Sequence, residues 1–211
     1  YITIIIIMTT IDNKITNRLS QKKIICKNVL NMMAERMLLD KDKIDSNYTK
    51  IIKKINELSY FECKLNNDEI LLVHFIDVKI TSLKKIDNID KIIDNKKHNI
   101  FIVNNIQNKI WEQLIEYNIE VFFNYEFMIN LIDHDIVPEH TLLTKVERVD
   151  FVKHYENEES KLPKILLYDP ISRYYNSKLK DIFRIKRPNI SSGYSIFYRI
   201  VISGPLSDIK K

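Results

Sequence analysis

A chain of 211 residues with 45% hydrophobic and 29% charged residues can bury one large core or two small ones, and it is too apolar to be disordered. Its formal net charge of +5 allows contact with nucleic acid without demanding it, because 28 acidic residues offset 33 basic ones. The 2 glycines both follow residue 190, which excludes a glycine-rich phosphate loop, and we expect the 2 cysteines to be free thiols in a reducing compartment.

The first seven residues, YITIIII, form an apolar run that ends at Met8. The run is shorter than the roughly 20 residues that cross a membrane, and it lacks the basic flank and cleavage site of a signal peptide. We interpret residues 1–7 as a non-native or disordered extension with Met8 as the expected start. We expect no membrane association, since no other apolar run approaches membrane length.

Helices and strands alternate in the first 133 residues. Continuous apolar runs of strand length occur at residues 70–76, 100–103 and 120–123. Helical spacing of apolar residues occurs at 15–37, 48–58, 83–95 and 106–117, and we expect a short helix or a helix-to-strand turn at 125–131. Strands that alternate with helices of about ten residues are typical of βαβ units, so we expect one α/β domain with a largely parallel sheet.

The first long helix carries basic residues mostly away from its apolar positions, namely Arg18, Lys22, Lys23, Lys27 and Arg36. Such a charge run is most often a solvated face, and this alternative stays open. The sharper interpretation is a basic face beside a nucleic-acid backbone, because each cation neutralises a phosphate. Arg18, Lys22, Lys23 and Lys27 are therefore the candidate DNA-proximal residues.

The pattern changes at residues 133–140, DHDIVPEH, where we expect a polar linker. We place a domain boundary here, which divides the chain into domains 8–134 and 135–211.

In the second domain, Thr144 followed by Glu147 matches a capping box that opens a helix over 144–155. Asp169-Pro170 is expected to open a helical turn. A short apolar segment at 165–167 precedes this turn, and two strand-like runs follow it at 181–187 and 194–202.

Metal-ligand residue types gather around the boundary: Asp133, His134, Asp135, Glu139 and His140. No HExxH spacing is present, and the group flanks Pro138, so a hydrogen-bonded linker is preferred over a metal site. We predict no catalytic residue, cofactor or metal ion for this chain.

Asp77-Val78-Lys79 follows a predicted strand, as in nucleases whose carboxylates hold Mg²⁺ while a Lys steadies the attacking water. An acid-x-Lys triplet is common in a Lys-rich chain, so the signal is weak. A metal-dependent nuclease centred on Asp77 and Lys79 is kept as an alternative.

The C-terminal third carries short motifs in a fixed order. They are Ile136-Val137-Pro138-Glu139-His140, Leu143-Thr144-Lys145, Leu162-Pro163-x-Ile165, Asp169-Pro170, Arg173-Tyr174-Tyr175, Ile185-Lys186-Arg187-Pro188, Ser192-Gly193-Tyr194 and Tyr198-Arg199-Ile200-Val201. In this order they resemble the C-terminal assembly domain of the fifth subunit shared by RNA polymerases I, II and III, whose archaeal counterpart consists of this domain alone. From about residue 11 the chain also resembles, more faintly, the N-terminal jaw domain of that family.

The resemblance implies a non-catalytic subunit of a multi-subunit DNA-directed RNA polymerase. In the family, the C-terminal domain docks on the largest subunit near other small subunits, and the jaw lies near downstream duplex DNA. The implied fold is α+β overall, with an α/β jaw domain whose central sheet is flanked by helices, and a small α+β assembly domain. The candidate interface residues are Pro138, His140, Leu162, Pro163, Asp169, Pro170, Arg173, Tyr174, Lys186, Arg187, Tyr194, Tyr198 and Arg199, although the tyrosines and prolines could equally be core and turn residues.

The family has a Gly-x-Lys-x-Gly hairpin. This chain has Asn176 and Lys180 at the positions of its two glycines. Asn tolerates the left-handed backbone conformation that glycine adopts, and Lys does so less readily.

The glycine-poor, Ile-, Asn- and Lys-rich composition indicates an A/T-rich genome, such as that of a large DNA virus or a protist. We expect the protein at the site of transcription, in the virion and host-cell cytoplasm if viral and in the nucleus if cellular. A stand-alone DNA-binding adaptor is the remaining alternative.

Overall fold

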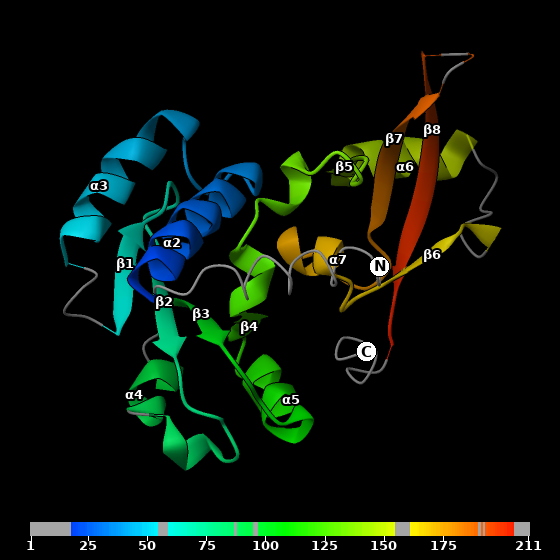
Figure 1. The fold of residues 1–211 in the computed structure, drawn as a ribbon. Coiled ribbons are helices and arrows are strands. Elements are labelled where there is room, and N and C mark those ends of the chain that lie inside the picture. The colour runs from blue at the N-terminus through cyan, green and yellow to red at the C-terminus, as the bar shows by residue number, and fades with distance from the viewer. Residues whose placement is uncertain are drawn as a thin grey trace. The chain divides into compact units, whose positions relative to one another are not determined.

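The computed structural model describes residues 18–54, 59–86, 88–94, 97–154, 161–189, 191 and 193–204. The chain forms two compact units, Tyr1–Ile129 and Asn130–Lys211, called here the N-terminal and C-terminal units (Figure 1). The predicted α+β fold class is confirmed, since both units combine helices with a sheet. Within the described ranges, no helix is both long and apolar enough to cross a bilayer. The expected extension at residues 1–7 lies outside the described residues.

The N-terminal unit is built on a four-stranded sheet in the order β1-β2-β3-β4. Its strands are β1 (Tyr60–Lys64), β2 (Ile70–Ile76), β3 (His98–Val103) and β4 (Glu120–Phe123). β2, β3 and β4 are parallel, as the continuous apolar runs predicted, and β1 pairs antiparallel with β2 at the edge. β1 was not predicted, because its residues alternate between buried and exposed and form no continuous apolar run.

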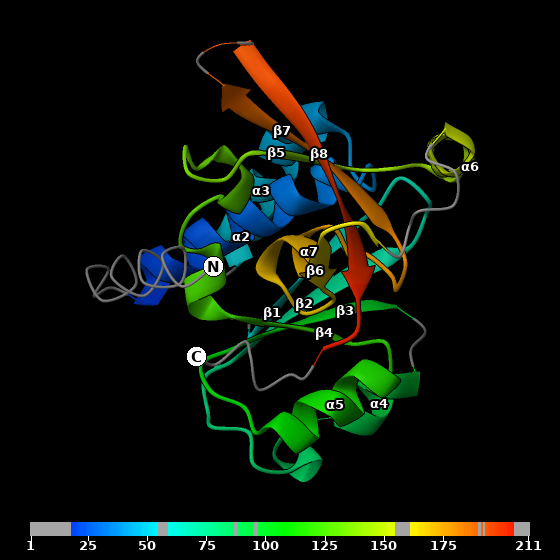
Figure 2. The same ribbon diagram turned by 90° about the vertical axis from the view of Figure 1, so that its right-hand side faces the viewer.

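Helices cover both faces of this sheet, with α2 and α3 on one face and α4 and α5 on the other (Figure 2). Their bounds are α2 (Arg18–Glu35), η1 (Lys41–Lys43), α3 (Ile44–Lys54), η2 (Leu83–Lys85), α4 (Ile89–Asp94), α5 (Asn108–Glu116) and η3 (Asn124–Phe127). Three expectations are wrong in detail. The helix expected at 83–95 is divided into η2 and α4, because Ile86 takes an extended backbone conformation. The first helix ends at Glu35 because Met37 takes a positive φ of 59° and is 87% exposed, and the second helix begins at residue 44 instead of 48.

The core of the N-terminal unit lies between α2 and the sheet on one side and between α5 and the sheet on the other. Val29, Leu30 and Met33 of α2 are completely buried, as is Val73 of β2. On α5, the indole ring of Trp111 meets the ring of Phe123 edge to face, with 5.4 Å between the ring centroids. This packing fixes the sheet between two helical layers, as the alternating pattern predicted.

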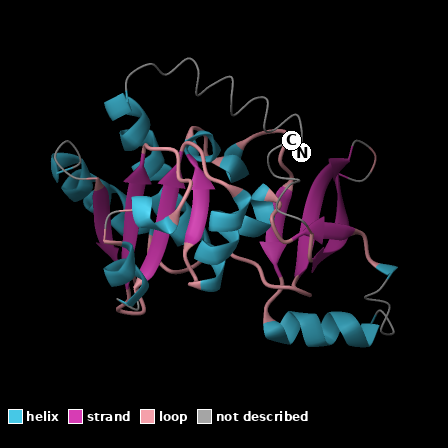
Figure 3. Ribbon diagram, turned by 90° about the horizontal axis from the view of Figure 1, so that it is seen from below, coloured by secondary structure: helices cyan, strands magenta, loops and turns pink. Residues whose placement is uncertain are grey.

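The C-terminal unit has a second four-stranded sheet, in the order β5-β7-β8-β6. Its elements are η4 (Leu131–Asp133), β5 (Glu139–Leu142), α6 (Lys145–His154), β6 (Lys164–Leu166), α7 (Pro170–Tyr174), β7 (Ile182–Asn189) and β8 (Gly193–Ile202). β7 forms antiparallel pairs with β5 and β8, and β6 is parallel to β8. Figure 3 shows α6 beside this sheet, where Phe151 packs against Ile182 and Ile200. The predicted end of the linker at residue 140 is wrong, because Glu139 and His140 are the first residues of β5.

Two local helix signals in this unit are confirmed. The backbone amide of Glu147 donates to Thr144 Oγ1 at 3.3 Å, and the amide of Thr144 donates to the Glu147 carboxylate at 2.9 Å, which completes the capping box. Asp169 caps α7, since its carboxylate accepts from the amide of Ile171 at 2.9 Å and Pro170 opens the helix.

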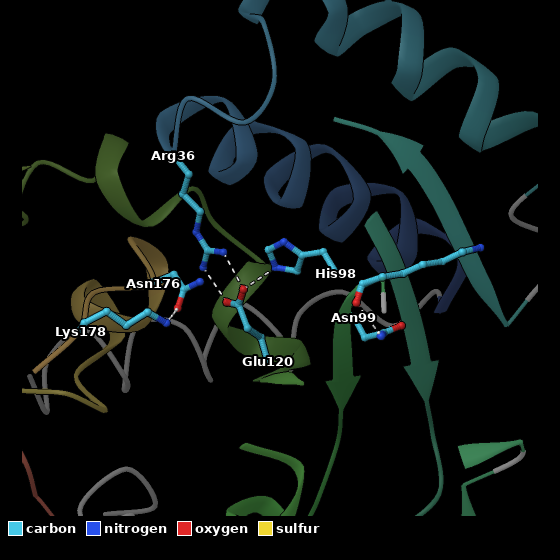
Figure 4. A network of polar contacts seen from close by, with 7 residues as sticks. Arg36, His98, Asn99, Glu120, Asn176 and Lys178 are labelled. Atoms are coloured by element: carbon cyan, nitrogen blue, oxygen red, sulfur yellow. Dashed lines mark hydrogen bonds and ion pairs between the residues drawn. The ribbon is translucent and has the colours of Figure 1, made fainter. Parts of the chain in front are cut away.

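The turn at residues 176–180 keeps a left-handed backbone without its glycines. Asn176 has φ 48° and Lys180 has φ 70°. The turn is held by the amide of Lys178, which donates to the Asp181 carboxylate at 2.6 Å, and by the amide of Lys180, which donates to the Val201 carbonyl at 2.9 Å. Lys178 Nζ also donates to Asn176 Oδ1 at 3.1 Å (Figure 4). Both positions are therefore left-handed, at a conformational cost for Lys180.

Replacing Lys180 with glycine is expected to raise the free energy of unfolding by about 0.5–1 kcal/mol, because relief of left-handed strain exceeds the added entropy of the unfolded chain. Denaturant unfolding would measure the change. The matched control is Lys180→Ala, which removes the exposed side chain but keeps the strain and should not stabilise. A Lys180→Gly protein less stable than wild type would contradict the argument.

Candidate functional site

The strands β7 and β8 extend beyond the rest of their sheet as a two-stranded ribbon. β5 pairs with β7 only up to Lys186, and β6 pairs with β8 only from Ile200 onward. Among the described strands, none covers the outer edge of residues 187–189 or of residues 193–199. We call residues 186–189 and 193–197 the hairpin end. An open strand edge exposes backbone donors and acceptors that can pair with another chain.

Large apolar side chains are exposed on the hairpin end. Tyr194 is 54% exposed, Ile196 is 49% exposed and Phe197 is 46% exposed. Lys186 Nζ lies 4.9 Å from the ring centroid of Tyr194, and the guanidinium carbon of Arg187 lies 5.1 Å from that of Phe197. Aromatic residues combined with cations and an open edge are typical of protein-binding surfaces.

The candidate interface residues differ widely in exposure. Four are exposed, namely Pro163, Lys186, Arg187 and Tyr194, and seven are half-buried, namely Pro138, His140, Leu162, Asp169, Arg173, Tyr198 and Arg199. Pro170 and Tyr174 are buried, so they are core residues of the unit and offer little surface to a partner. The structure thus brings Lys186, Arg187 and Tyr194 together on the hairpin end. The sequence analysis did not name Ile196 and Phe197, which lie in the strand-like run 194–202 and are exposed.

His140 and Asp169 have structural contacts within the unit. His140 Nδ1 lies 2.6 Å from the Pro138 carbonyl oxygen, and its ring meets Phe183 edge to face at 6.0 Å. Burial, with the nearby charges of Arg199 and Arg187, lowers the pKa of His140 against the hydrogen bond to Pro138. Burial raises the pKa of Asp169, and this effect outweighs the helix-capping hydrogen bond from Ile171, which by itself lowers the pKa. Neither environment resembles a catalytic acid–base pair.

The candidate DNA-proximal residues of α2 point in two directions. Arg18 forms an ion pair with Asp77, and Lys22 Nζ lies 5.2 Å from the ring centroid of Phe75, so both meet the sheet. Lys27 is exposed and its Nζ lies 5.9 Å from the ring of Tyr48 on α3, and Lys23 is half-buried. The four cations therefore do not form one continuous stripe.

The nuclease alternative finds no geometric basis. The carboxylate of Asp77 is occupied by Arg18, and Lys79 is exposed. Across the described segments, no group of three or more His, Cys, Asp or Glu side chains could hold a metal ion. A nuclease of this type needs such a group for its Mg²⁺.

One buried charge network was missed by the sequence analysis (Figure 4). Both guanidinium nitrogens of Arg36 donate to the Glu120 carboxylate, at 2.8 and 2.7 Å, and His98 Nε2 lies 2.6 Å from the same group. The side chain of Arg36 is only 4% exposed, so its expected place on a solvated basic face is wrong. Burial by itself would raise the pKa of Glu120, but the charge of Arg36 and the hydrogen bonds from His98 and Arg36 outweigh it and lower the pKa to about 2.

The sequence of the chain is similar to known proteins. The family model described as "RNA polymerase Rpb5, C-terminal domain" matches residues 129–201. The chain is 30% identical over 197 residues to the DNA-directed RNA polymerases I, II, and III subunit rpabc1 of Dictyostelium discoideum, covering 88% of this chain and 98% of that protein. It is 30% identical over 189 residues to DNA-directed RNA polymerase subunit 5 of Acanthamoeba polyphaga mimivirus, covering 85% and 91%. It is also 44% identical over 70 residues to DNA-directed RNA polymerase subunit Rpo5 of Methanothrix thermoacetophila, covering 33% of this chain and 90% of the archaeal protein.

Proposed function

Because the chain belongs to the RNA polymerase subunit 5 (Rpb5) family, we propose that it is a non-catalytic subunit of a multi-subunit DNA-directed RNA polymerase. The family membership predicted from the C-terminal motifs is confirmed by these matches. Relatives come from a protist, a giant virus and an archaeon, which fits the viral or protist source inferred from composition. The protein would then act wherever that polymerase transcribes, in the virion and host-cell cytoplasm if viral and in the nucleus if cellular.

We propose further that the C-terminal unit docks on the largest polymerase subunit, near other small subunits. The hairpin end is the observation that carries this proposal. It combines an open strand edge with exposed Tyr194, Ile196 and Phe197, and a monomeric protein gains nothing from leaving such a surface in water. An extended segment of the partner could add to β8 by backbone hydrogen bonds, while its side chains contact these apolar groups.

Affinity purification of the tagged full-length chain from its native source tests the function and the partner together. We expect the two largest polymerase subunits to be recovered in amounts comparable to the tagged chain. A stand-alone DNA-binding adaptor would instead be recovered without them. Purification that repeatedly yields the chain alone would refute the subunit assignment.

The N-terminal unit is proposed to lie near downstream duplex DNA and to touch it weakly, without sequence preference. Lys23 and Lys27 of α2 are the cations best placed for this, because no described carboxylate pairs with either of them. Phosphate contacts of this kind position a protein without reading the bases.

Raising the salt concentration fourfold is expected to weaken binding of the full-length chain to a short duplex by roughly ten- to fortyfold, if two or three phosphates are contacted. Fluorescence anisotropy with two unrelated duplexes would measure the slope and the lack of preference. A Lys23→Ala/Lys27→Ala protein should bind less tightly with a shallower slope. Lys109→Ala, which removes an exposed cation from α5 on the other face of the sheet, is the matched control. Salt-independent binding would contradict the prediction.

A further inference from the structure

A cavity of about 280 Å³ opens beside the sheet of the N-terminal unit. Three of its lining residues directly follow a parallel strand: Asp77 follows β2, Asn104 follows β3 and Asn124 follows β4. The carboxyl ends of all three strands thus meet at the cavity. In open α/β sheets, ligands bind in the crevice outside these ends, so the cavity has the position of a ligand site.

The helix α2 closes the cavity with polar side chains from its first turns. Arg18, Gln21 and Lys22 line the wall, and the buried side chains of Ile25 and Phe75 complete the lining. Among the described lining residues, the charged groups are two cations and the carboxylate of Asp77, so their formal sum is positive. Among the amides, Asn124 Nδ2 donates to Asn104 Oδ1, so the amino group of Asn104 is not used in this bond and can donate to a ligand.

Lys22 is the cation that most lacks a counter-charge. Its Nζ lies over the Phe75 ring, and among the described residues no carboxylate forms an ion pair with it. Burial, and after it the charge of Arg18, lowers the pKa of Lys22. An anion in the cavity would relieve both effects, because it would face Arg18 and Lys22 together.

We propose that this cavity binds one phosphate group, with Lys22 and Arg18 as its charge partners and Asn104 as a hydrogen-bond donor. A volume of about 280 Å³ is slightly below the roughly 300–1,000 Å³ of ligand pockets, so the phosphate can carry only a small substituent inside. The phosphate could belong to a nucleic-acid backbone or to a free phosphate or phosphomonoester. The inference goes beyond the proposed polymerase function and does not require it.

Titration of the isotope-labelled full-length chain with inorganic phosphate, at constant ionic strength, tests the proposal. The side-chain amide signals of Asn104 and Asn124 should shift with a Kd of about 1 mM. Lys22→Met keeps the packing against Phe75 but removes the charge, and it should weaken phosphate binding about tenfold or more. Asn104→Asp keeps the acceptor for Asn124 and adds a negative charge, so it should abolish the shifts.

Asp77→Asn is expected to act in the opposite direction. It releases Arg18 from its ion pair and removes the one carboxylate among the described lining residues, so phosphate should bind several-fold tighter. The matched control is Lys109→Met, which removes an exposed cation of α5 outside the cavity and should leave the phosphate affinity within twofold. Thermal unfolding of each variant separates loss of binding from loss of fold.

A second arm replaces phosphate by a short DNA duplex. If the duplex shifts the same amide signals and phosphate competes with it, the bound group is a backbone phosphate. If phosphate shifts them and the duplex does not, the cavity serves a free phosphate compound. Both results support a phosphate site. The proposal is overturned if phosphate leaves these signals unmoved, or if Lys109→Met weakens binding as much as Lys22→Met.

Discussion

Replacing Arg36 with methionine is expected to lower the free energy of unfolding of the full-length chain by about 3–5 kcal/mol. The guanidinium makes two hydrogen bonds to Glu120 and is 4% exposed, so its removal leaves a buried carboxylate with only His98 beside it. Methionine fills most of the space, so the loss reports the missing charge and not a cavity. Denaturant unfolding followed by tryptophan fluorescence suits the measurement, since Trp111 lies in the same unit.

The same network makes stability depend on pH in the acid range. The pKa of Glu120 is lowered from 4.5 to about 2 on folding, so the unfolded chain binds a proton that the folded chain excludes between these values. The contribution of Glu120 is therefore fully present above about pH 4.5 and is lost as the pH falls toward 2, by about 3 kcal/mol in all. Glu120→Gln should remove this part of the profile and leave the rest unchanged.

A matched control separates this buried pair from ordinary surface charges. Lys43 Nζ forms an ion pair with Asp40 at 2.7 Å, but both side chains are more than half exposed. Lys43→Met is expected to leave stability nearly unchanged, because exposed pairs contribute little. If Arg36→Met lowered the free energy of unfolding as little as Lys43→Met, the Arg36–Glu120 pair would not stabilise the fold.

The features that depend on neighbours along the chain were predictable. The Thr144–Glu147 capping box and the Asp169-Pro170 helix start follow from spacings of a few residues, and both are present. The three parallel strands were predicted because buried strands in such sheets are continuous apolar runs. The conformation of the turn at Asn176 and Lys180 was not predicted, because hydrogen bonds to Asp181 and Val201 hold it without glycine.

Features that depend on the three-dimensional order of elements were not predictable. Arg36 and Glu120 are 84 positions apart, and only the sheet order places the end of α2 beside β4. The cavity at Asp77, Asn104 and Asn124 likewise exists only because three separate strands end at one edge. A single charged residue in a helix pattern is therefore ambiguous between surface and core until its partner is known.

Truncating Ile196 and Phe197 together to alanine is expected to reduce recovery of the largest polymerase subunit with the tagged chain by about a hundredfold or more. Both side chains are nearly half exposed in the chain alone, so they have apolar surface to bury against a partner. A residue at the centre of an interface contributes about 2 kcal/mol or more on truncation, and two such residues suffice for this loss. Quantitative mass spectrometry of the native purification would give the ratio of the two proteins.

The control removes apolar side chains that are at least as exposed as Ile196 and Phe197 from another surface of the same unit. Val146 and Val149 of α6 are 72% and 54% exposed, and Val146→Ala/Val149→Ala should leave recovery unchanged. Because Ile196 and Phe197 lie mostly outside the core, the double alanine protein should unfold within a few degrees of wild type, which separates lost docking from lost folding. Normal recovery of the polymerase with a folded Ile196→Ala/Phe197→Ala protein would place the docking surface elsewhere on the chain. The family assignment would stand in that case, since it rests on residues 129–201 as a whole and on relatives that match most of the chain.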